Sequence, residues 1–307
     1  MNWRIKVAAF KLLSALPGGS GFYRFLQQRV TRSLAPTTNR INQKLEVGLQ
    51  YFRTLKEMQK DEILVNGVHL DFGTGWHPTI PLLYYCLGTP RQYLFDIVSV
   101  LDDKLIEGTV KTFLEIVNQP DWPDSGLLRR LPPVNVGPDW QRYLESLGIT
   151  YAAPYAEVFP SLTGKVDVVT CTQVLMHIPR DIMRWCFTEI YKSLKPGGLF
   201  LSTVHLKDLY ANTQSGLSKY NHLRYSPKSW ARWVNSPLMS FNRFKARDYR
   251  ELLEETKFEI VRFDVEGATE EDLAELEQIP IAKCFARYSK EELAAKHLFF
   301  VGRKRER

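Results

Sequence analysis

Two glycines and an acidic residue follow a short apolar run, in a pattern that could form a ligand-binding turn. Residues 70–78 read Leu-Asp-Phe-Gly-Thr-Gly-Trp-His-Pro and directly follow a short apolar run. Gly73 and Gly75 permit a tight turn that lets a ligand approach the backbone closely. The helix expected next would point its free N–H groups at that ligand. Asp71 stands just before the turn, where a carboxylate can hold a cationic group.

A second acidic residue indicates a ligand that contains adenosine. Asp96 closes the next apolar run, about 20 residues after the glycines, the spacing at which an acid reaches ribose hydroxyls. A dinucleotide would require a third small residue three positions after Gly75, but that residue is Pro78. Trp76 and His77 add bulk where a pyrophosphate would lie. A nicotinamide-dependent dehydrogenase is therefore disfavoured, and a ligand with a cationic centre and no phosphate fits better.

The elements that would position these residues alternate between short apolar runs and helical patterns. This alternation predicts β-α units and a parallel sheet. A stretch at 118–138 contains five prolines and no period, so it is expected to be a loop. Strands are expected at 68–72, 92–96, 149–153, 166–171, 199–204, 258–265 and 298–302, and helices at 79–87, 102–117, 139–147, 181–194, 247–255, 270–278 and 289–296.

Two segments are additions to this alternating pattern. Residues 1–62 read as a helical extension, broken at 17–19 and near Pro36, and residues 63–307 as the main domain. Within that domain, 205–247 is rich in polar and aromatic residues and reads as an inserted lid. The first helix has apolar residues at helical spacing, so it packs on the protein or lies on a membrane surface. Its apolar positions are Val7, Phe10, Leu13 and Leu16, and its basic residues are Arg4, Lys6 and Lys11.

The composition is that of a globular protein in a reducing compartment. The net charge of +7 is scattered, apart from a basic tail at 303–307, and no dense basic run alternates with aromatic residues. Nucleic-acid binding is therefore disfavoured. The four cysteines are widely spaced, with no metal-ligand spacing, and they fit a cytoplasmic location best.

Four segments, taken in order, resemble the class I S-adenosylmethionine-dependent methyltransferases. They are the first glycine motif at 70–75, the acid Asp96, the strand and loop at 166–178, and the Leu-Lys-Pro-Gly-Gly turn into a strand at 194–201. The resemblance covers 65–205 well and 248–303 more loosely. It implies an α/β fold: a seven-stranded, mostly parallel sheet with helices on both faces and an antiparallel last strand.

The resemblance also implies where S-adenosyl-L-methionine would bind. Asp71, Gly73 and Gly75 would line its methionine part, and Asp96 would bind its ribose. Other cofactor positions come from the ends of the third and fourth strands. Pro154 and Tyr155 would flank the adenine, although the acidic residue often found there is missing, and Thr172 and Gln173 would lie beside the sulfonium.

Three histidines fall in loops at the same end of the predicted sheet. His77 follows the glycine turn, His177 the fourth strand and His205 the fifth, and Asp208 could orient His205. Histidine is the usual general base near neutral pH, so these three are the catalytic candidates. For each, a packed or capping histidine is the competing interpretation. No cluster of metal ligands is expected.

The additions to the minimal fold are expected to select the methyl acceptor, because loops usually carry specificity. The predicted acceptor is a small polar molecule, such as a sugar, a glycan or a secondary metabolite. The alternatives are an RNA-modifying methyltransferase, a non-enzymatic cofactor-binding protein, and an enzyme that uses the cofactor for other chemistry. The candidate substrate-binding residues are Trp76, His222, Arg224, Tyr225 and Arg243.

Overall fold

The computed structural model describes residues 4, 5, 7, 8, 11, 34–211, 214–235 and 240–306. The chain divides into two compact units. We call the first the glycine-loop unit; it comprises Ser33–Thr172, Thr188–Leu201 and Gly302–Arg307. The second, the lid unit, comprises Gln173–Phe187 and Ser202–Val301 with the described residues before position 33. The predicted boundaries at 62/63 and 205–247 remain predictions.

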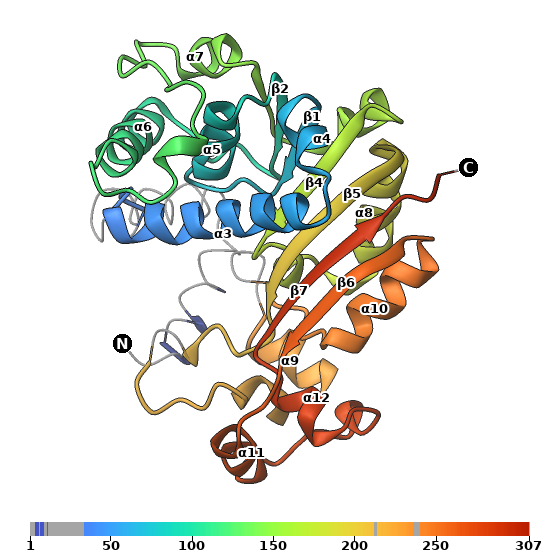
Figure 1. The fold of residues 1–307 in the computed structure, drawn as a ribbon. Helices are drawn as coiled ribbons and strands as arrows, with labels where there is room; N and C mark the ends of the chain where they lie inside the picture. Colours follow the sequence, from blue (N-terminus) through green and yellow to red (C-terminus); the bar gives the residue numbers. More distant parts are fainter. Residues whose placement is uncertain are drawn as a thin grey trace. The chain divides into compact units, whose positions relative to one another are not determined.

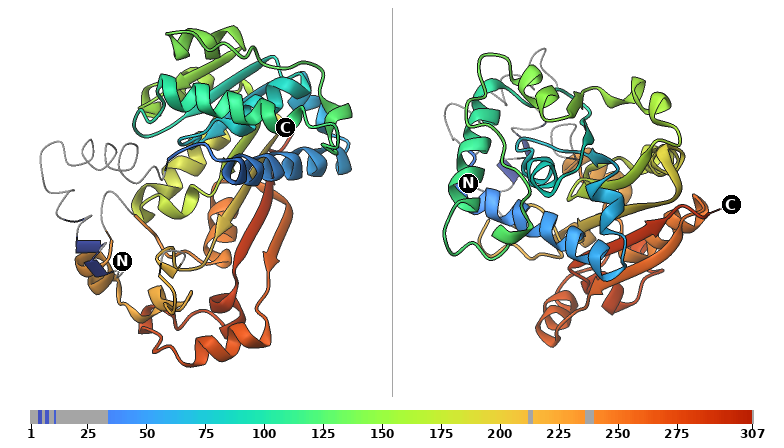
Figure 2. Two further views of the ribbon diagram at one scale, coloured as in Figure 1. Left: turned by 90° about the vertical axis from the view of Figure 1, so that its left-hand side faces the viewer. Right: turned by 45° about the horizontal axis from the view of Figure 1, so that its top comes forward.

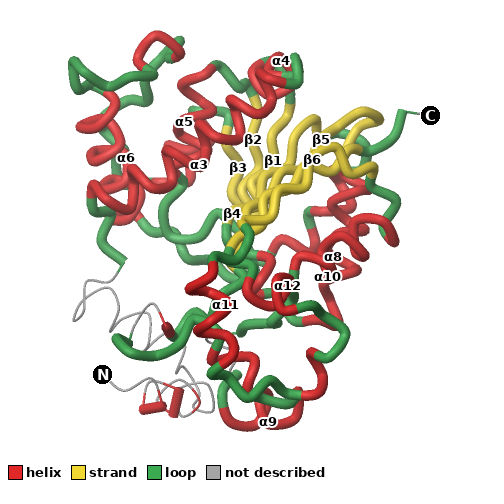
Figure 3. The backbone as a smooth tube through the Cα atoms, turned by 60° about the horizontal axis from the view of Figure 1, so that its bottom comes forward, coloured by secondary structure: helices red, strands yellow, loops and turns green. Residues whose placement is uncertain are grey.

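The glycine-loop unit is built on parallel strands whose side chains are largely buried. β1 (Val68–Phe72) pairs in parallel with β2 (Arg91–Phe95) and with β4 (Val166–Thr172), and β2 pairs in parallel with β3 (Ile149–Ala152). Figure 3 shows these strands side by side in yellow. Apolar runs without polar alternation are typical of strands covered on both faces. Because the strands are parallel, their carboxyl ends lie at one edge.

Helices of this unit pack against its strands and against one another (Figure 1). They are α3 (Thr38–Glu57), α4 (Asp61–Val65), α5 (Thr79–Leu87), α6 (Asp103–Val117) and α7 (Trp140–Ser146). α3 packs on α5 and α6, and a Cβ atom at Gly48 would come within 2.9 Å of Leu83, so a small residue is required there. The Asp102 carboxylate accepts a hydrogen bond from the Leu105 N–H and caps α6.

The lid unit contains the last part of the sheet: the end of the fifth strand from Ser202 on, the sixth strand and most of the seventh. β7 (His297–Arg303) lies between β5 (Leu194–His205) and β6 (Glu259–Glu266) in the strand order β3-β2-β1-β4-β5-β7-β6. Contacts of β5 with the β7 region run from Gly197 with Lys304 to Leu206 with Lys296, so these strands are antiparallel. Figure 2 shows β6 and β7 running side by side. The helices are α9 (Pro227–Trp233), α10 (Ala246–Glu255), α11 (Glu270–Glu277) and α12 (Lys290–Ala294), and α8 (Arg180–Ser193) begins here.

The predicted fold class is confirmed: seven mostly parallel strands with flanking helices and an antiparallel last strand. The largest difference is at β5, which begins at Leu194 rather than 199. The Lys-Pro-Gly-Gly stretch therefore belongs to the strand, because Gly197 N–H donates to Lys304 O and Lys304 N–H to Gly198 O. The 118–138 segment contains only the short 3-10 helix Ser125–Leu127, as a loop should.

The first predicted helix lies mostly outside the described residues. Phe10, Leu13, Leu16, Lys6 and the break at 17–19 are among the residues that the structure leaves undescribed. The Nζ of Lys11 donates to the carbonyl oxygens of Ala231 and Arg232 at 3.2 and 2.7 Å. Within the described ranges, no helix has the length and apolar character needed to cross a lipid bilayer.

Candidate cofactor and ligand sites

The glycine loop forms the predicted tight turn at the end of β1. Gly73 and Gly75 have positive φ angles of 85° and 67°, a conformation that only glycine adopts readily. The Gly73 N–H donates to Phe95 O at 2.8 Å and so ties the loop to the end of β2. A Cβ atom at Gly75 would meet no atom within 4 Å. The requirement for glycine there comes from the backbone angle, and the loop faces open space that a ligand can fill.

Asp96 lies beside this open space. Its carboxylate accepts hydrogen bonds from the Gly75 N–H at 3.1 Å and from the Tyr151 hydroxyl at 3.3 Å. Burial raises the pKa of Asp96 to about 7, and the neighbouring charge of Asp71 adds to the rise. The Gly75 hydrogen bond and the ammonium of Lys44 oppose it. Because burial disfavours the ionised form of this carboxylate, it gains from the hydroxyl donors of a ribose.

Asp71 is buried, and both of its carboxylate oxygens already have hydrogen-bond partners within the protein. The residue is 4% exposed, and its two carboxylate oxygens accept hydrogen bonds from the Thr74 and Thr170 hydroxyls at 2.9 and 3.0 Å. These bonds hold the turn to β1 and β4. Asp71 therefore shapes the glycine loop, and its direct contact with the methionine part of a cofactor remains a prediction.

A lysine that was not among the predicted site residues also holds the loop. Lys44, in the middle of α3, donates from Nζ to the carbonyl oxygens of Thr74 and His77 at 3.0 and 2.7 Å. Burial lowers its pKa, whereas the carboxylates of Asp71 and Asp96 raise it. A lysine on the face of α3 that also buries Ile41 and Leu45 was the available signal, because buried lysines usually have a specific partner.

Aromatic rings form a cluster at the end of β3. Tyr155 stacks on Phe95, with ring centroids 5.9 Å apart, and meets Phe72 edge-on at 5.1 Å. Its N–H donates to Asp96 O at 3.2 Å, so Tyr155 lies at the same strand edge as the acid. Pro154 precedes it and is exposed. Ile97 and Val98, which were not among the predicted site residues, directly follow Asp96 and are 67% and 58% exposed.

Thr172 is the last residue of β4, and Gln173 follows it and belongs to the other unit. In the glycine-loop unit, the Thr172 hydroxyl lies 3.1 Å from the Tyr51 hydroxyl of α3. In the lid unit, Gln173 has a φ angle of 58°, and its side-chain oxygen accepts a hydrogen bond from the His205 N–H at 2.7 Å. Gln173 thus fixes the end of β5, and its predicted place beside a sulfonium remains a prediction.

The three candidate bases all have lowered pKa values, with burial as the largest cause. The pKa of His77 falls to about 3 and that of His205 to about 4. His77 Nδ1 lies 3.2 Å from the Thr109 hydroxyl, and His177 Nδ1 lies 2.8 Å from Ser240 O, which makes that nitrogen the donor. All three imidazoles are therefore neutral at pH 7 and weakly basic.

His205 differs from the other two in its partners. Its ring meets that of His297 edge-on at 4.2 Å, and its buried Nδ1 has no hydrogen-bond partner among the described residues. The idea that Asp208 orients this ring is wrong in the structure. The Asp208 carboxylate accepts hydrogen bonds from the Tyr210 N–H and the Asn221 amide instead, because the chain turns back on itself directly after β5.

The substrate candidates of the lid unit divide into buried and exposed residues. Arg243 Nη1 donates to His222 O and Tyr225 O at 3.1 and 2.6 Å, so these three residues do come together. The His222 ring is fully buried, 3.3 Å from the Lys245 ammonium, and is poorly placed to touch a substrate. Arg224 is exposed. Trp76 belongs to the glycine-loop unit and is partly buried.

Among the residues that the structure describes, no group of three or more His, Cys, Asp or Glu side chains could hold a metal ion. Cys86, Cys171 and Cys186 are buried free thiols, and Cys284 is an exposed one.

Comparison with known proteins gives one family match and several similar solved structures. Residues 30–262 match the family model described as a methyltransferase domain. No curated protein matches the sequence. A solved structure of a candidate sarcosine dimethylglycine methyltransferase from Galdieria sulphuraria is 16% identical, with a TM-score of 0.44 and coverage of 84% of this chain and 86% of that one.

Two further solved structures are similar at the same level. A SAM-dependent methyltransferase from Methanosarcina mazei is 15% identical, with a TM-score of 0.43 over 79% of this chain and 94% of that one. The Haemonchus contortus phospholethanolamine N-methyltransferase 2, solved with S-adenosylhomocysteine, is 16% identical, with a TM-score of 0.42 over 79% of this chain and 50% of that one.

The family assignment follows from the family match together with the site. The matched residues cover more than half of the chain. They include the glycine loop that faces open space and the carboxylate of Asp96 at the adjacent strand end, both of which fit the loop and ribose contacts that S-adenosylmethionine requires. This chain belongs to the class I S-adenosylmethionine-dependent methyltransferases.

Proposed function

We propose that this enzyme methylates a small polar acceptor, either a sugar or glycan or a secondary metabolite, held by the lid at 205–247 and the N-terminal helices. S-adenosylmethionine supplies an electrophilic methyl group on a sulfonium. In this proposal Asp96 holds the ribose, the glycine loop accommodates the methionine part, and Tyr155 lies against the adenine. The apolar surface of Ile97 and Val98 offers a second contact for that base.

One cavity in the lid unit supports a hydroxyl-rich acceptor. It has a volume of about 430 Å³. Its polar walls include Ser218, Asn221, Arg224, Glu275 and Gln278, which combine hydrogen-bond donors and acceptors as a sugar requires. Ser218 is held by a 2.6 Å hydrogen bond to Glu275. Three of these five residues come from the predicted lid.

A labelled-methyl experiment tests the acceptor class. The purified enzyme is incubated with S-adenosylmethionine carrying a tritiated methyl group and with separate cell fractions: metabolites below 3 kDa, polysaccharide, RNA and protein. We expect label in the metabolite or polysaccharide fraction, and much less label with the Asp96→Ala variant at a subsaturating cofactor concentration. Label in RNA would replace the proposal with the RNA-modifying alternative, and label in no fraction would favour a cofactor-binding protein.

Cofactor binding should weaken as the pH falls below 7. The pKa of Asp96 is about 7 in the free protein, and ribose hydroxyls donate best to its ionised form. About ten in eleven of these carboxylates are ionised at pH 8 and about one in eleven at pH 6, so we expect affinity to fall roughly tenfold over this range. Calorimetric titration at constant ionic strength measures it. The Asp96→Asn variant, which cannot titrate, should show no such trend.

Methyl transfer itself should show little dependence on the three histidines. Their lowered pKa values make each a weak base, so orientation of the acceptor must supply most of the rate. With saturating S-adenosylmethionine and the acceptor fraction found above, kcat of His77→Gln, His177→Gln and His205→Gln should each fall less than about tenfold. A strong general base contributes 100-fold or more. A rise in kcat centred near pH 6.5 that one of these variants removes would contradict the prediction.

A further inference from the structure

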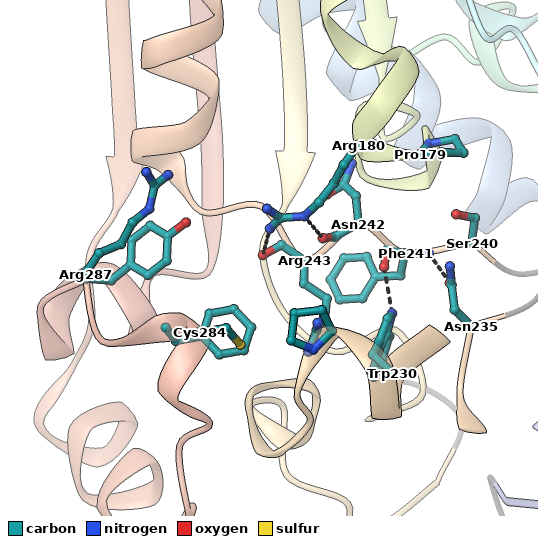
Figure 4. Close-up of a pocket in the computed structure, with 13 residues that line it drawn as sticks. Pro179, Arg180, Trp230, Asn235, Ser240, Phe241, Asn242, Arg243, Cys284 and Arg287 are labelled. Carbon is teal, nitrogen blue, oxygen red and sulfur yellow. Dashed lines mark hydrogen bonds between the residues drawn. The ribbon is translucent and has the colours of Figure 1, made fainter. Parts of the chain in front are cut away.

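A second cavity in the lid unit, separate from the polar one above, is lined by arginines. It has a volume of about 270 Å³ and lies among the start of α8, α9, residues 240–243 and the chain at 284–288. Figure 4 shows Arg180 and Arg287 on two sides of it, with Phe241 and Trp230, which belongs to α9, below Arg180 in this view. Arg180, Arg243 and Arg287 all line it, and none of the described lining residues is acidic.

The three guanidinium groups differ in how their charge is balanced. Arg287 forms ion pairs with Asp248 and Glu251. Arg180 instead donates to the main-chain oxygens of Asn242 at 2.9 Å and Arg243 at 3.5 Å. Neither Arg180 nor Arg243 pairs with a carboxylate among the described residues. Two positive charges therefore face a cavity without a matching negative charge.

Arg243 is buried in the protein interior without a carboxylate partner among the described residues. It is 5% exposed and lies between the rings of Trp230 and Phe285, with its guanidinium carbon 4.8 and 5.1 Å from their centroids. Nη1 donates to two carbonyl oxygens, and the buried Nε has no hydrogen-bond partner among the described residues. Burial lowers its pKa to about 10. Burying an arginine without a carboxylate is costly, and an anionic ligand would offset that cost.

We propose that this cavity binds the carboxylate or phosphate of a small organic anion. Guanidinium groups present parallel donors that match both anions. The aromatic walls, which include Trp230, Phe241 and Phe285, favour a ligand whose remainder is a ring or another flat apolar group. The volume admits about one ring with its anionic group. The proposal does not depend on which acceptor the enzyme methylates.

Cys284 provides a direct reporter of occupancy. It lines the cavity and is exposed, whereas Cys86, Cys171 and Cys186 are buried. A thiol-reactive bimane should therefore label the native protein at Cys284, and the Cys284→Ser variant should remain unlabelled. At constant ionic strength, saturating benzoate or phenyl phosphate should slow labelling at least fivefold. Neutral benzamide, which has the same ring, should not. Protection by inorganic phosphate is compared with protection by phenyl phosphate, to show whether the cavity prefers a phosphate ester to the free ion.

Two matched variants test the arginines. Arg180→Gln should weaken the binding of benzoate or phenyl phosphate about tenfold. Arg184→Gln removes the same charge from the same helix, at a position paired with Glu255 outside the cavity, and should leave binding within twofold. Arg243→Gln should abolish binding, with circular dichroism reporting whether it folds.

Several outcomes would overturn the proposal. These are no protection by either organic anion, equal protection by benzamide, equal protection by inorganic phosphate and phenyl phosphate, or equal effects of the Arg180 and Arg184 variants. Calorimetric binding of S-adenosylmethionine, run on the same samples, keeps a failure here distinct from a failure of the cofactor site, because the glycine loop and Asp96 belong to the glycine-loop unit and the arginine cavity to the lid unit.

Discussion

Replacing Asp96 by alanine should weaken S-adenosylmethionine binding by at least about a hundredfold. The substitution removes a carboxylate that would accept two ribose hydroxyls, and each hydrogen bond to a charged group contributes about 1.5–3 kcal/mol. Asp96→Asn keeps the shape and one acceptor oxygen, so we expect an intermediate loss of about tenfold. Calorimetric titration of both variants gives the ratio.

The same substitutions should leave the fold intact. The raised pKa of Asp96 means that folding disfavours its ionised form, so removing that charge removes no stabilising ion. We therefore expect the thermal midpoint of either variant to stay within a few degrees of the parent. Asp121→Asn, an exposed acid of the same unit, is the matched control and should bind as the parent does. Equal affinity of Asp96→Ala and the parent would remove Asp96 from the site.

The strands and the glycine loop could be predicted from the sequence because each depends on local patterns. β1 and α5 match their predicted bounds, since an apolar run, a glycine turn and a helical period follow one another there. Asp96 could be placed near Gly75 because parallel strands end at one edge of a sheet. β5 was the exception, since its early start depends on pairing with Lys304, more than 100 residues away.

Side-chain partners far apart in the sequence could not be predicted in this way. Asp208 is three residues from His205 but bonds with Asn221, because the path of the turn, not the sequence interval, sets its neighbours. Arg243 could be selected as a polar residue of the lid, yet its position between Trp230 and Phe285 depends on tertiary packing. Lys44 is 30 residues before the loop that it holds.

Lys44→Met should therefore both destabilise the fold and weaken cofactor binding. The Nζ of Lys44 donates to Thr74 O and His77 O, and methionine keeps the length of the side chain but no donor. The loss of these charged hydrogen bonds should lower the free energy of unfolding by about 1–3 kcal/mol. Because the glycine loop would lose an anchor on α3, we expect the affinity for S-adenosylmethionine to fall about tenfold. Urea unfolding and calorimetry measure the two effects.

Lys56→Met is the matched control, because Lys56 is an exposed lysine in the last turn of the same helix. It should cost less than about 1 kcal/mol, mainly from the helix dipole, and leave cofactor affinity unchanged. If Lys44→Met lowers stability but binds S-adenosylmethionine as the parent does, Lys44 only attaches α3 to the sheet edge. If both quantities change, the N-terminal helix sets the shape of the cofactor loop, and α3 belongs functionally to the site although it precedes every strand of the sheet.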